Sequence, residues 1–358
     1  MVDPDNAYRP DLAIPPGETL KETIDALGIT QVELARRMGR PLKTVNEIIN
    51  GKAMITSETA LQLELVVGVP AVFWTNLERN HQLTKARLAE DRRLATEIEL
   101  ARRYPYRDLV VHGCVQPAHR PLERVRELLK FLGVNSLTAV ELPDCALRIA
   151  VRSRPSPESL AAWLRMGELA CRFEAVQPYD QDLLSSMIPE FRNLTMGESA
   201  DWPGRLRSRC AEAGVAVAFV PHLPGTFAHG ATRWIGPTKA LVQLSLRYRY
   251  ADIFWFTFFH ELGHILKHGK RDVFIEVDRP SENPKEAEAN EFAARVLIPD
   301  AQYAQFVHVG SFDERSIRLF ASAIGIHQGI VVGRLQRDDH LDHSALNHLR
   351  MKLKFASE

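Results

Sequence analysis

The sequence predicts a mainly α-helical fold with one small β-sheet, of the α+β class. Helical periodicity, bounded by capping residues and by glycine or proline stops, recurs along most of the chain. Strand-like runs stand out only at residues 215–220 and 240–246. The 358 residues exceed what one hydrophobic core usually serves, so we expect more than one domain.

Composition excludes several classes of protein. With 45% hydrophobic and 25% charged residues, the chain is too apolar to be disordered and is not repetitive enough to be fibrous. Basic and acidic residues balance at 45 each, so any DNA binding must come from a local patch. The N-terminus lacks the features of a signal peptide, and no apolar run is long enough for a membrane span. We therefore expect a cytoplasmic protein without membrane contact, with four scattered and reduced cysteines at positions 114, 145, 171 and 210.

Five helices are predicted in the N-terminal domain, residues 14–85. Four of them end at glycine or Asn-Gly signals, and they cover residues 17–27, 31–38, 42–49 and 57–67. Pro70 opens a fifth helix that continues toward Arg103. Thr30 and Glu33 form a capping box for the second helix, and Pro41 is expected at the first position of the third.

The second and third of these helices have the layout of a helix-turn-helix motif. Small Ala35 lies where the helices would cross, Gly39 lies in the turn, and Val45 faces the core. Residues 36–52 contain five basic residues and one acidic residue, whereas residues 1–80 contain 8 basic and 11 acidic residues. Positive charge is therefore concentrated where DNA phosphates would lie.

Polar side chains on this motif are candidates for contacts with double-stranded DNA. The predicted contacts are Gln31, Arg40, Lys43, Thr44, Asn46, Asn50 and Lys52. Lys43, Thr44 and Asn46 lie early in the third helix, where base edges are read. A helical dimerisation or scaffold module of the same shape is the alternative.

The remaining chain is expected to form three parts. Residues 86–200 give weaker signals, with helices at 122–132 and 156–173, and we expect a mainly helical connector. Residues 201–300 contain the predicted strands and helices at 252–268 and 285–297. Residues 301–358 contain two short helices around Gly325, which resemble a second helix-turn-helix but are expected to pack against the preceding domain.

A metal-binding string, His260-Glu261-Leu262-Gly263-His264, lies inside the predicted helix 252–268. Residues four apart share a helix face, so both imidazoles can converge on one ion, and zinc favours such nitrogen ligands. Glu261 is offset by about 100 degrees, which can place its carboxylate beside the open coordination position. Zinc lowers the pKa of water to about 7 there. The string therefore predicts hydrolysis of a peptide bond with Glu261 as the general base.

Such a site needs a third protein ligand, and Glu286 and Glu288 are the candidates. Glu286 lies close to the apolar stripe of its helix, whereas Glu288 points away, so we expect Glu286. One zinc ion per chain would then be held by His260, His264 and Glu286.

Two further residues and the identity of the metal complete this prediction. Asn290, one turn after Glu286, is placed to hydrogen-bond a ligand from behind. His268 is either a further ligand or a cap on the helix end. Manganese and iron are the alternatives to zinc at the same ligands.

The N-terminal segment resembles a known family through four strings of residues. They are Pro16-Gly17-Glu18, Ile48-Ile49-Asn50-Gly51-Lys52, Ile55-Thr56 and Phe73-Trp74-Thr75-Asn76-Leu77. With these strings, residues 14–83 resemble the XRE-type helix-turn-helix domain of the HigA antitoxin group. Pro41-Leu42 departs from the Ser-Arg usual in that group, which leaves fewer donors for reading bases. The resemblance implies operator DNA as a partner, together with a possible toxin, and we expect a homodimer.

Residues 205–300 resemble a second family. The matching strings are Phe256-Thr257, His260 to His264, Glu286 to Asn290, Phe292-Ala293 and Leu297-Ile298-Pro299. They resemble the ImmA/IrrE family of metallo-endopeptidases, which implies a zincin-like fold and zinc-dependent cleavage of helix-turn-helix repressors. The two resemblances together cover less than half of the chain.

We therefore expect a DNA-binding transcriptional regulator whose peptidase cleaves a repressor-type protein, or this chain itself, to control stress, mobile-element or toxin-antitoxin genes. Tethering would raise the effective concentration of the peptidase at the operator. Strand 240–246 is either an edge that receives an extended substrate or an interior strand. The alternatives are a non-enzymatic HigA-like regulator that uses the zinc fold as a scaffold or sensor, and an antitoxin that binds a toxin through residues 86–200.

Overall fold

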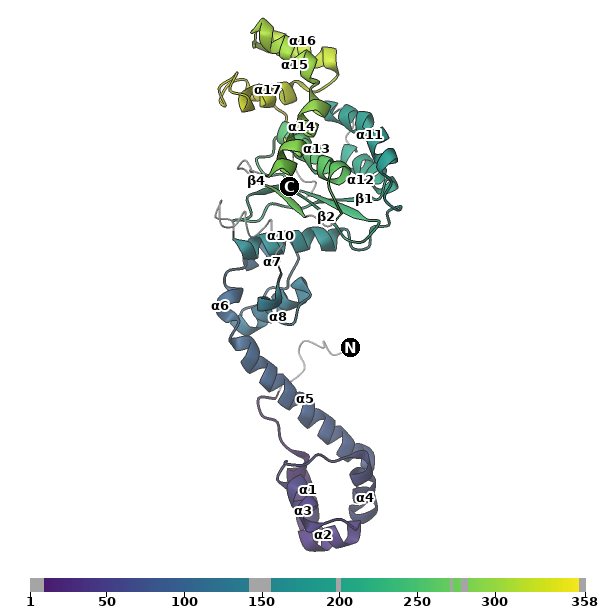
Figure 1. The fold of residues 1–358 in the computed structure, drawn as a ribbon. Coiled ribbons are helices and arrows are strands. Elements are labelled where there is room, and N and C mark those ends of the chain that lie inside the picture. The colour runs from purple at the N-terminus through teal and green to yellow at the C-terminus, as the bar shows by residue number, and fades with distance from the viewer. Residues whose placement is uncertain (1–9, 142–155, 198–200, 271–272, 278–282, 354–358) are drawn as a thin grey trace. The chain divides into compact units, whose positions relative to one another are not determined.

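The computed structural model describes residues 10–141, 156–197, 201–270, 273–277 and 283–353 (Figure 1). The chain divides into two compact units, residues 1–98 and residues 99–358. The finer division into four domains stays a prediction. Cys145 and the extreme N-terminus, on which two sequence-based expectations rest, lie outside the described residues.

The described residues of the N-terminal unit, from 10 to 97, contain five helices. They are α1 (Pro16–Ala26), α2 (Gln31–Met38), α3 (Leu42–Ile49), α4 (Ser57–Val67) and α5 (Ala71–Ala95). The five predicted helices are thus confirmed, and the last of them ends at Ala95 instead of continuing toward Arg103. The expected place of Pro41 is wrong by one position, because its ψ of 140° is extended and the helix begins at Leu42.

The turn between α2 and α3 forms as its residues dictate. The Thr30 hydroxyl accepts a hydrogen bond from the Glu33 backbone N–H, which caps α2. Gly39 ends α2 with a φ of 64°, a conformation that costs glycine little. Ala35 and Val45 are buried at the crossing of the two helices, as predicted.

Close packing of α1 against α3 depends on Gly17. A Cβ at this position would lie 2.2 Å from the carbonyl oxygen of Ile48, so a larger residue would push the helices apart. Trp74 of α5 is fully buried in the same core as Ile48. The recognition segment α3 is therefore held by helices on both sides of it in sequence.

The second unit contains the sheet and the remaining helices. The helices are α6 (Ile98–Ala101), α7 (Tyr106–Val111), α8 (Pro121–Leu132), α10 (Pro157–Ala170), α11 (Gln181–Asn193), α12 (Trp202–Glu212), α13 (Ala251–Lys267), α14 (Pro284–Leu297), α15 (Asp300–Val309), α16 (Glu314–Ile324) and α17 (Gln328–Arg337). The strands are β1 (Val215–Phe219), β2 (Ala228–Trp234), β3 (Ala240–Leu244) and β4 (Phe274–Val277). The predicted strands β1 and β3 are confirmed, whereas β2 lies in a segment that we interpreted as turns.

The four strands form one mixed sheet in the order β1-β3-β2-β4. Strand β1 is parallel to β3, and β2 is antiparallel to both β3 and β4. Of the two alternatives for this strand, β3 is therefore the interior one, and it cannot receive a substrate by strand addition because both of its edges are already paired. Among the described strands, β1 and β4 are the edges.

Helices cover both faces of the sheet (Figure 1). On one face, the side-chain amide of Gln243 donates to the carbonyl of Trp163 in α10. Strand alternation places Val242 and Leu244 on the other face, in one core with Phe258 of α13. Helix α13 is consequently buried between the sheet, α14 and α17.

The two C-terminal helices α16 and α17 meet at an angle of 113° around Gly325, which explains their likeness to a helix-turn-helix. Val331 and Val332 of α17 are fully buried in the core that contains α13, so the expected packing against the preceding domain is confirmed. No single described helix is long and apolar enough to cross a membrane, and α16 with α17 meets that criterion only as a bent pair.

Candidate functional site

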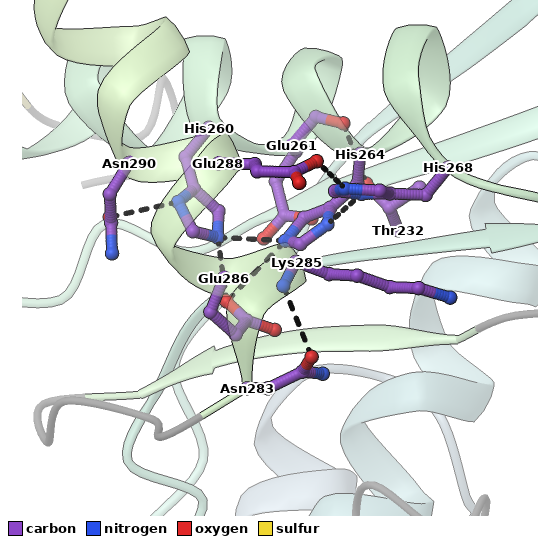
Figure 2. Close-up of polar contacts among 10 residues, drawn as sticks. All are labelled: Thr232, His260, Glu261, His264, His268, Asn283, Lys285, Glu286, Glu288 and Asn290. Atoms are coloured by element: carbon purple, nitrogen blue, oxygen red, sulfur yellow. Dashed lines mark hydrogen bonds and ion pairs between the residues drawn. The ribbon is translucent and has the colours of Figure 1, made fainter.

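Helix α13 directs the rings of His260 and His264 toward a common point (Figure 2). Their Nε2 atoms lie 2.9 Å apart. Glu286, in the first turn of α14, places its Oε2 3.1 Å from Nε2 of His260 and 3.4 Å from Nε2 of His264. The two helices approach closely at Gly263, where a Cβ would lie 3.2 Å from the Cα of Ala289. Small residues at the crossing thus bring together the three predicted ligands.

The three donor atoms match the requirements of a zinc ion. Four-coordinate zinc with bonds of about 2.0–2.1 Å holds its ligand atoms about 3.3 Å apart in a tetrahedron. The separations of 2.9, 3.1 and 3.4 Å bracket that value. These residues form one of the two groups of His, Cys, Asp or Glu among the described residues that could hold a metal ion.

Asn290 contacts the Nδ1 side of the His260 ring, whose Nε2 faces the cluster. Its Oδ1 lies 3.1 Å from His260 Nδ1, which can donate its proton there and leave Nε2 unprotonated toward the cluster. Side-chain partners of this kind fix the tautomer and the ring orientation of metal-binding histidines. The structure therefore places Asn290 where the sequence analysis expected it.

His268 and Glu288 form a matching arrangement behind His264 (Figure 2). Nδ1 of His264 lies 3.0 Å from Nδ1 of His268, and Nε2 of His268 lies 3.1 Å from Oε2 of Glu288. The ring of His264 also stacks on Phe274 of β4, with centroids 3.8 Å apart. His268 thus contacts a candidate ligand instead of joining the cluster, and Glu288 lies outside it. The spacing of four residues was the sequence signal that His268 would lie beside His264 on one face of the helix.

Glu261 is fully buried, and neither of its carboxylate oxygens has a hydrogen-bond partner among the described residues. Its backbone carbonyl accepts from the hydroxyl of Thr232 on β2. Gly230 makes this position accessible, because a Cβ there would lie 2.5 Å from Oε1 of Glu261. An unpartnered buried carboxylate is costly, so a group outside the protein is needed to satisfy it.

Burial and mutual charge shift the pKa values of these side chains. Burial raises the pKa of Glu261 well above its usual value. Burial lowers the pKa of His260, but the carboxylates of Glu276, Glu286 and Glu261 outweigh it and raise that pKa to about 9. Burial raises the pKa of Glu286, whereas hydrogen bonds from His260 and His264 prevail and lower it to about 2. Burial lowers the pKa of His264.

Glu276, which the sequence analysis missed, lies on β4 beside this cluster. One of its oxygens, a nitrogen of His260 and an oxygen of Glu261 lie within 4.8 Å of one another. Phe274 and Glu276 alternate along β4, so both face α13. The β-branched residues Ile275 and Val277 were the available sequence signal for this strand.

A second candidate surface lies on α3 of the N-terminal unit. A shallow hollow of about 400 Å³ is lined by Leu42, Lys43, Asn46, Glu47, Asn50 and Lys52. Four of these are predicted DNA contacts, and Lys43 and Lys52 are exposed. Thr44 and Gln31 are partly buried. The side-chain amide of Asn50 donates to the carbonyl of Asn46, which fixes it at the helix end.

Carboxylates outside residues 36–52 pair with part of the positive charge counted there. Arg36 and Arg37 both bond to Glu33, and hydrogen bonds from Arg36 and then Arg37 lower the Glu33 pKa to about 2. Arg40 bonds to Gln62 and lies 3.0 Å from Glu58, so it is held against α4. Lys43 and Lys52 are exposed, and the carboxylate of Glu47 lies 3.9 Å from Lys43. These two lysines are therefore better placed than the arginines to contact DNA phosphates.

Two family models match segments of this chain. Residues 20–74 match the helix-turn-helix family model, and residues 253–332 match the IrrE N-terminal-like domain. The HTH-type transcriptional regulator YddM of Escherichia coli is 34% identical over 86 residues, which are 23% of this chain and 92% of that protein. Antitoxin HigA-1 of Vibrio cholerae is 38% identical over 63 residues, which are 17% of this chain and 59% of that antitoxin.

A solved structure also matches the N-terminal part. An addiction module antidote protein of the HigA family from Coxiella burnetii is 31% identical, with 24% of this chain and 94% of that chain covered and a TM-score of 0.22. The YddM match spans nearly that entire regulator, and both family models fall where their motifs lie. The chain therefore belongs to the HTH-type transcriptional regulators and carries an IrrE N-terminal-like domain on the same polypeptide.

Proposed function

We propose that this protein is a DNA-binding regulator with a zinc-dependent endopeptidase that cleaves a repressor-type protein or the chain itself. One observation carries the enzymatic part. His260, His264 and Glu286 converge within 3.4 Å, and the buried carboxylate of Glu261 beside them has no partner. A scaffold would gain nothing from such a carboxylate, because its burial costs stability.

Each residue of the site has a separate role in the proposed hydrolysis. Zinc at the three ligands would polarise a peptide carbonyl and lower the pKa of water. Glu261 takes the proton of the attacking water, since its free oxygens offer acceptors and its raised pKa favours holding a proton. Glu261 then returns that proton to the leaving amine. Asn290 and His268 hold the two imidazoles in place.

Strand β4 is the surface that fits an extended substrate. It pairs with β2 on one side and is an edge of the described sheet on the other. A peptide can add to such an edge through backbone hydrogen bonds, with alternate side chains facing α13. This assignment replaces β3, which is interior.

Metal content tests the site directly. Purified wild-type protein should bind about one zinc ion per chain, and His260→Ala and Glu286→Ala should lose it. Glu288→Ala should keep it, because Glu288 lies outside the cluster. Substrates, including the chain itself, are then sought by incubating zinc-loaded protein and its Glu261→Gln variant with cellular repressors. No zinc after reconstitution of the wild type would contradict the peptidase.

Operator DNA is the partner proposed for α3. Selection from random duplex DNA should yield a site whose binding weakens on Lys43→Ala and Asn46→Ala. Lys43→Ala should lower the salt dependence of binding by about one phosphate contact. Arg36→Ala serves as a control, because Arg36 pairs with Glu33. Equal binding by all three variants would contradict this surface. Homodimer formation is tested by the mass of the free protein.

The match to antitoxin HigA-1 favours a second candidate function. In that case the protein neutralises a toxin and regulates its own operator without proteolysis. The second candidate predicts that operator occupancy is the same with and without zinc, and in the Glu261→Gln variant. The peptidase proposal predicts that zinc changes occupancy only when Glu261 is intact.

A further inference from the structure

A cavity of about 580 Å³ lies beside the metal-ligand cluster. Helices α13, α14 and α17, the segment after β3 and strand β4 all contribute to its walls. Much of the lining is apolar, including Ile253 and Phe256 of α13, Leu297 of α14 and Ile330 of α17. Cavities of roughly 300–1,000 Å³ with apolar walls and few polar groups are typical binding sites. This one has room for a side chain and the backbone next to it.

Glu276 lies where this cavity meets the cluster. It lines the cavity, and one of its oxygens is within 4.8 Å of ligand atoms of His260 and Glu261. Its Oε2 is buried and has no hydrogen-bond partner among the described residues. Fully buried Glu261 beside it is also unpartnered. A bound group with N–H donors would satisfy the Glu276 carboxylate.

The arginines of the cavity wall have carboxylates nearby, and Asp338 is shared by two of them. Arg350 lies 2.7 Å from Asp252, and Arg334 lies 2.5 Å from Asp338. Arg337 covers the ring of Phe256, 4.4 Å from its centroid, and lies 3.7 Å from Asp338.

The metal would not neutralise Glu276. A metal held by His260, His264 and Glu286 would leave the Glu276 carboxylate outside its ligand set. A positive charge on the ligand is the complement to that carboxylate, in a site where partial burial strengthens the attraction.

We propose that Glu276 binds a cationic nitrogen of the peptide substrate next to the scissile bond, while the cavity receives an adjacent apolar side chain or aliphatic stem. This inference rests on the proposed peptidase function. The cation comes either from the side chain of lysine or arginine or from the free α-ammonium of the peptide. Both would donate charge-assisted hydrogen bonds to Oε2. Glu276 is accordingly a specificity residue that distinguishes cationic from neutral substrates.

Binding to a protein that cannot turn over tests this inference apart from catalysis. The probes are mixtures of hexapeptides that contain lysine, the same mixtures with norleucine in its place, and both with free or acetylated N-termini. Binding to zinc-loaded Glu261→Gln protein is measured by calorimetry. We expect lysine or a free amine to improve affinity about 10- to 100-fold, and Glu276→Gln in the same background to abolish that preference. Glu291→Gln, an exposed carboxylate of α14 that pairs with Arg295, is the matched control.

The arms of the experiment separate the possible results. A preference that survives acetylation identifies a side chain, and one lost on acetylation identifies the α-ammonium. No preference for cations, no binding of any mixture, or a preference unchanged by Glu276→Gln would overturn the inference. Zinc content and thermal unfolding of the Glu276→Gln variant verify that it is folded. Cleavage of the bound peptides by protein with Glu261 intact tests the peptidase separately, because binding is measured without it.

Discussion

Replacement of His268 tests whether the arrangement behind His264 supports metal binding. In His268→Ala, Nδ1 of His264 loses the acceptor that lies 3.0 Å away. His264 is only 1% exposed, so water does not readily replace that acceptor. A buried donor without a partner costs about 1–3 kcal/mol, which corresponds to about a 5- to 150-fold change in an equilibrium constant. We expect zinc affinity to fall about 10- to 100-fold, the range typical of such partners.

Competition with a chromophoric chelator at neutral pH measures this affinity without reliance on activity. His268→Asn should recover part of the loss, because its amide oxygen can still accept from His264. His308→Ala, an exposed histidine of α15, should leave the affinity unchanged. Thermal unfolding of the metal-free variants separates a lost orientation from a lost fold. Wild-type zinc affinity in folded His268→Ala would refute the reasoning.

Three further predictions follow from particular contacts. Arg350→Ala leaves the buried carboxylate of Asp252 without its partner at 2.7 Å. The free energy of unfolding, measured with denaturant, should fall by about 3 kcal/mol. A decrease below about 1 kcal/mol would count against this prediction. Gly230→Ala places a methyl group 2.5 Å from Oε1 of Glu261. The rate of peptide hydrolysis should fall about 100-fold while the zinc content is unchanged. An undiminished rate of hydrolysis would contradict this prediction. Zinc must displace the proton of His260, whose pKa is raised to about 9. Zinc affinity should therefore rise about tenfold per pH unit up to about pH 9. A zinc affinity that does not change with pH would show this prediction to be wrong.

Several helix boundaries could be predicted from nearby residues in the sequence. Glycines with positive φ end α2 and α4 where expected, because few other residues adopt that conformation cheaply. Strand β2 was missed because glycine and polar residues interrupt its apolar pattern, and β4 because it is only four residues long. Gly230 and His229 in β2 resemble a loop until the close approach of Glu261 explains the glycine.

The candidate metal centre shows the same division. Spacing on one helix places His260 and His264 together, and the apolar stripe of α14 selects Glu286 over Glu288. No short-range sequence pattern shows that α13 lies beside β4. The stacking of His264 on Phe274 and the proximity of Glu261 to Glu276 therefore could not be predicted.

Most helices, their caps and the set of side chains proposed to hold zinc could be predicted from local sequence, because these depend on residues within a few turns of one another. The edge strands, the arginines of the helix-turn-helix that pair with carboxylates, and the groups around Glu261 became known only from the folded structure. Long-range packing settles those features. The proposed function of Glu276 is of this second kind, since its charge is left uncompensated only when β4 lies against α13.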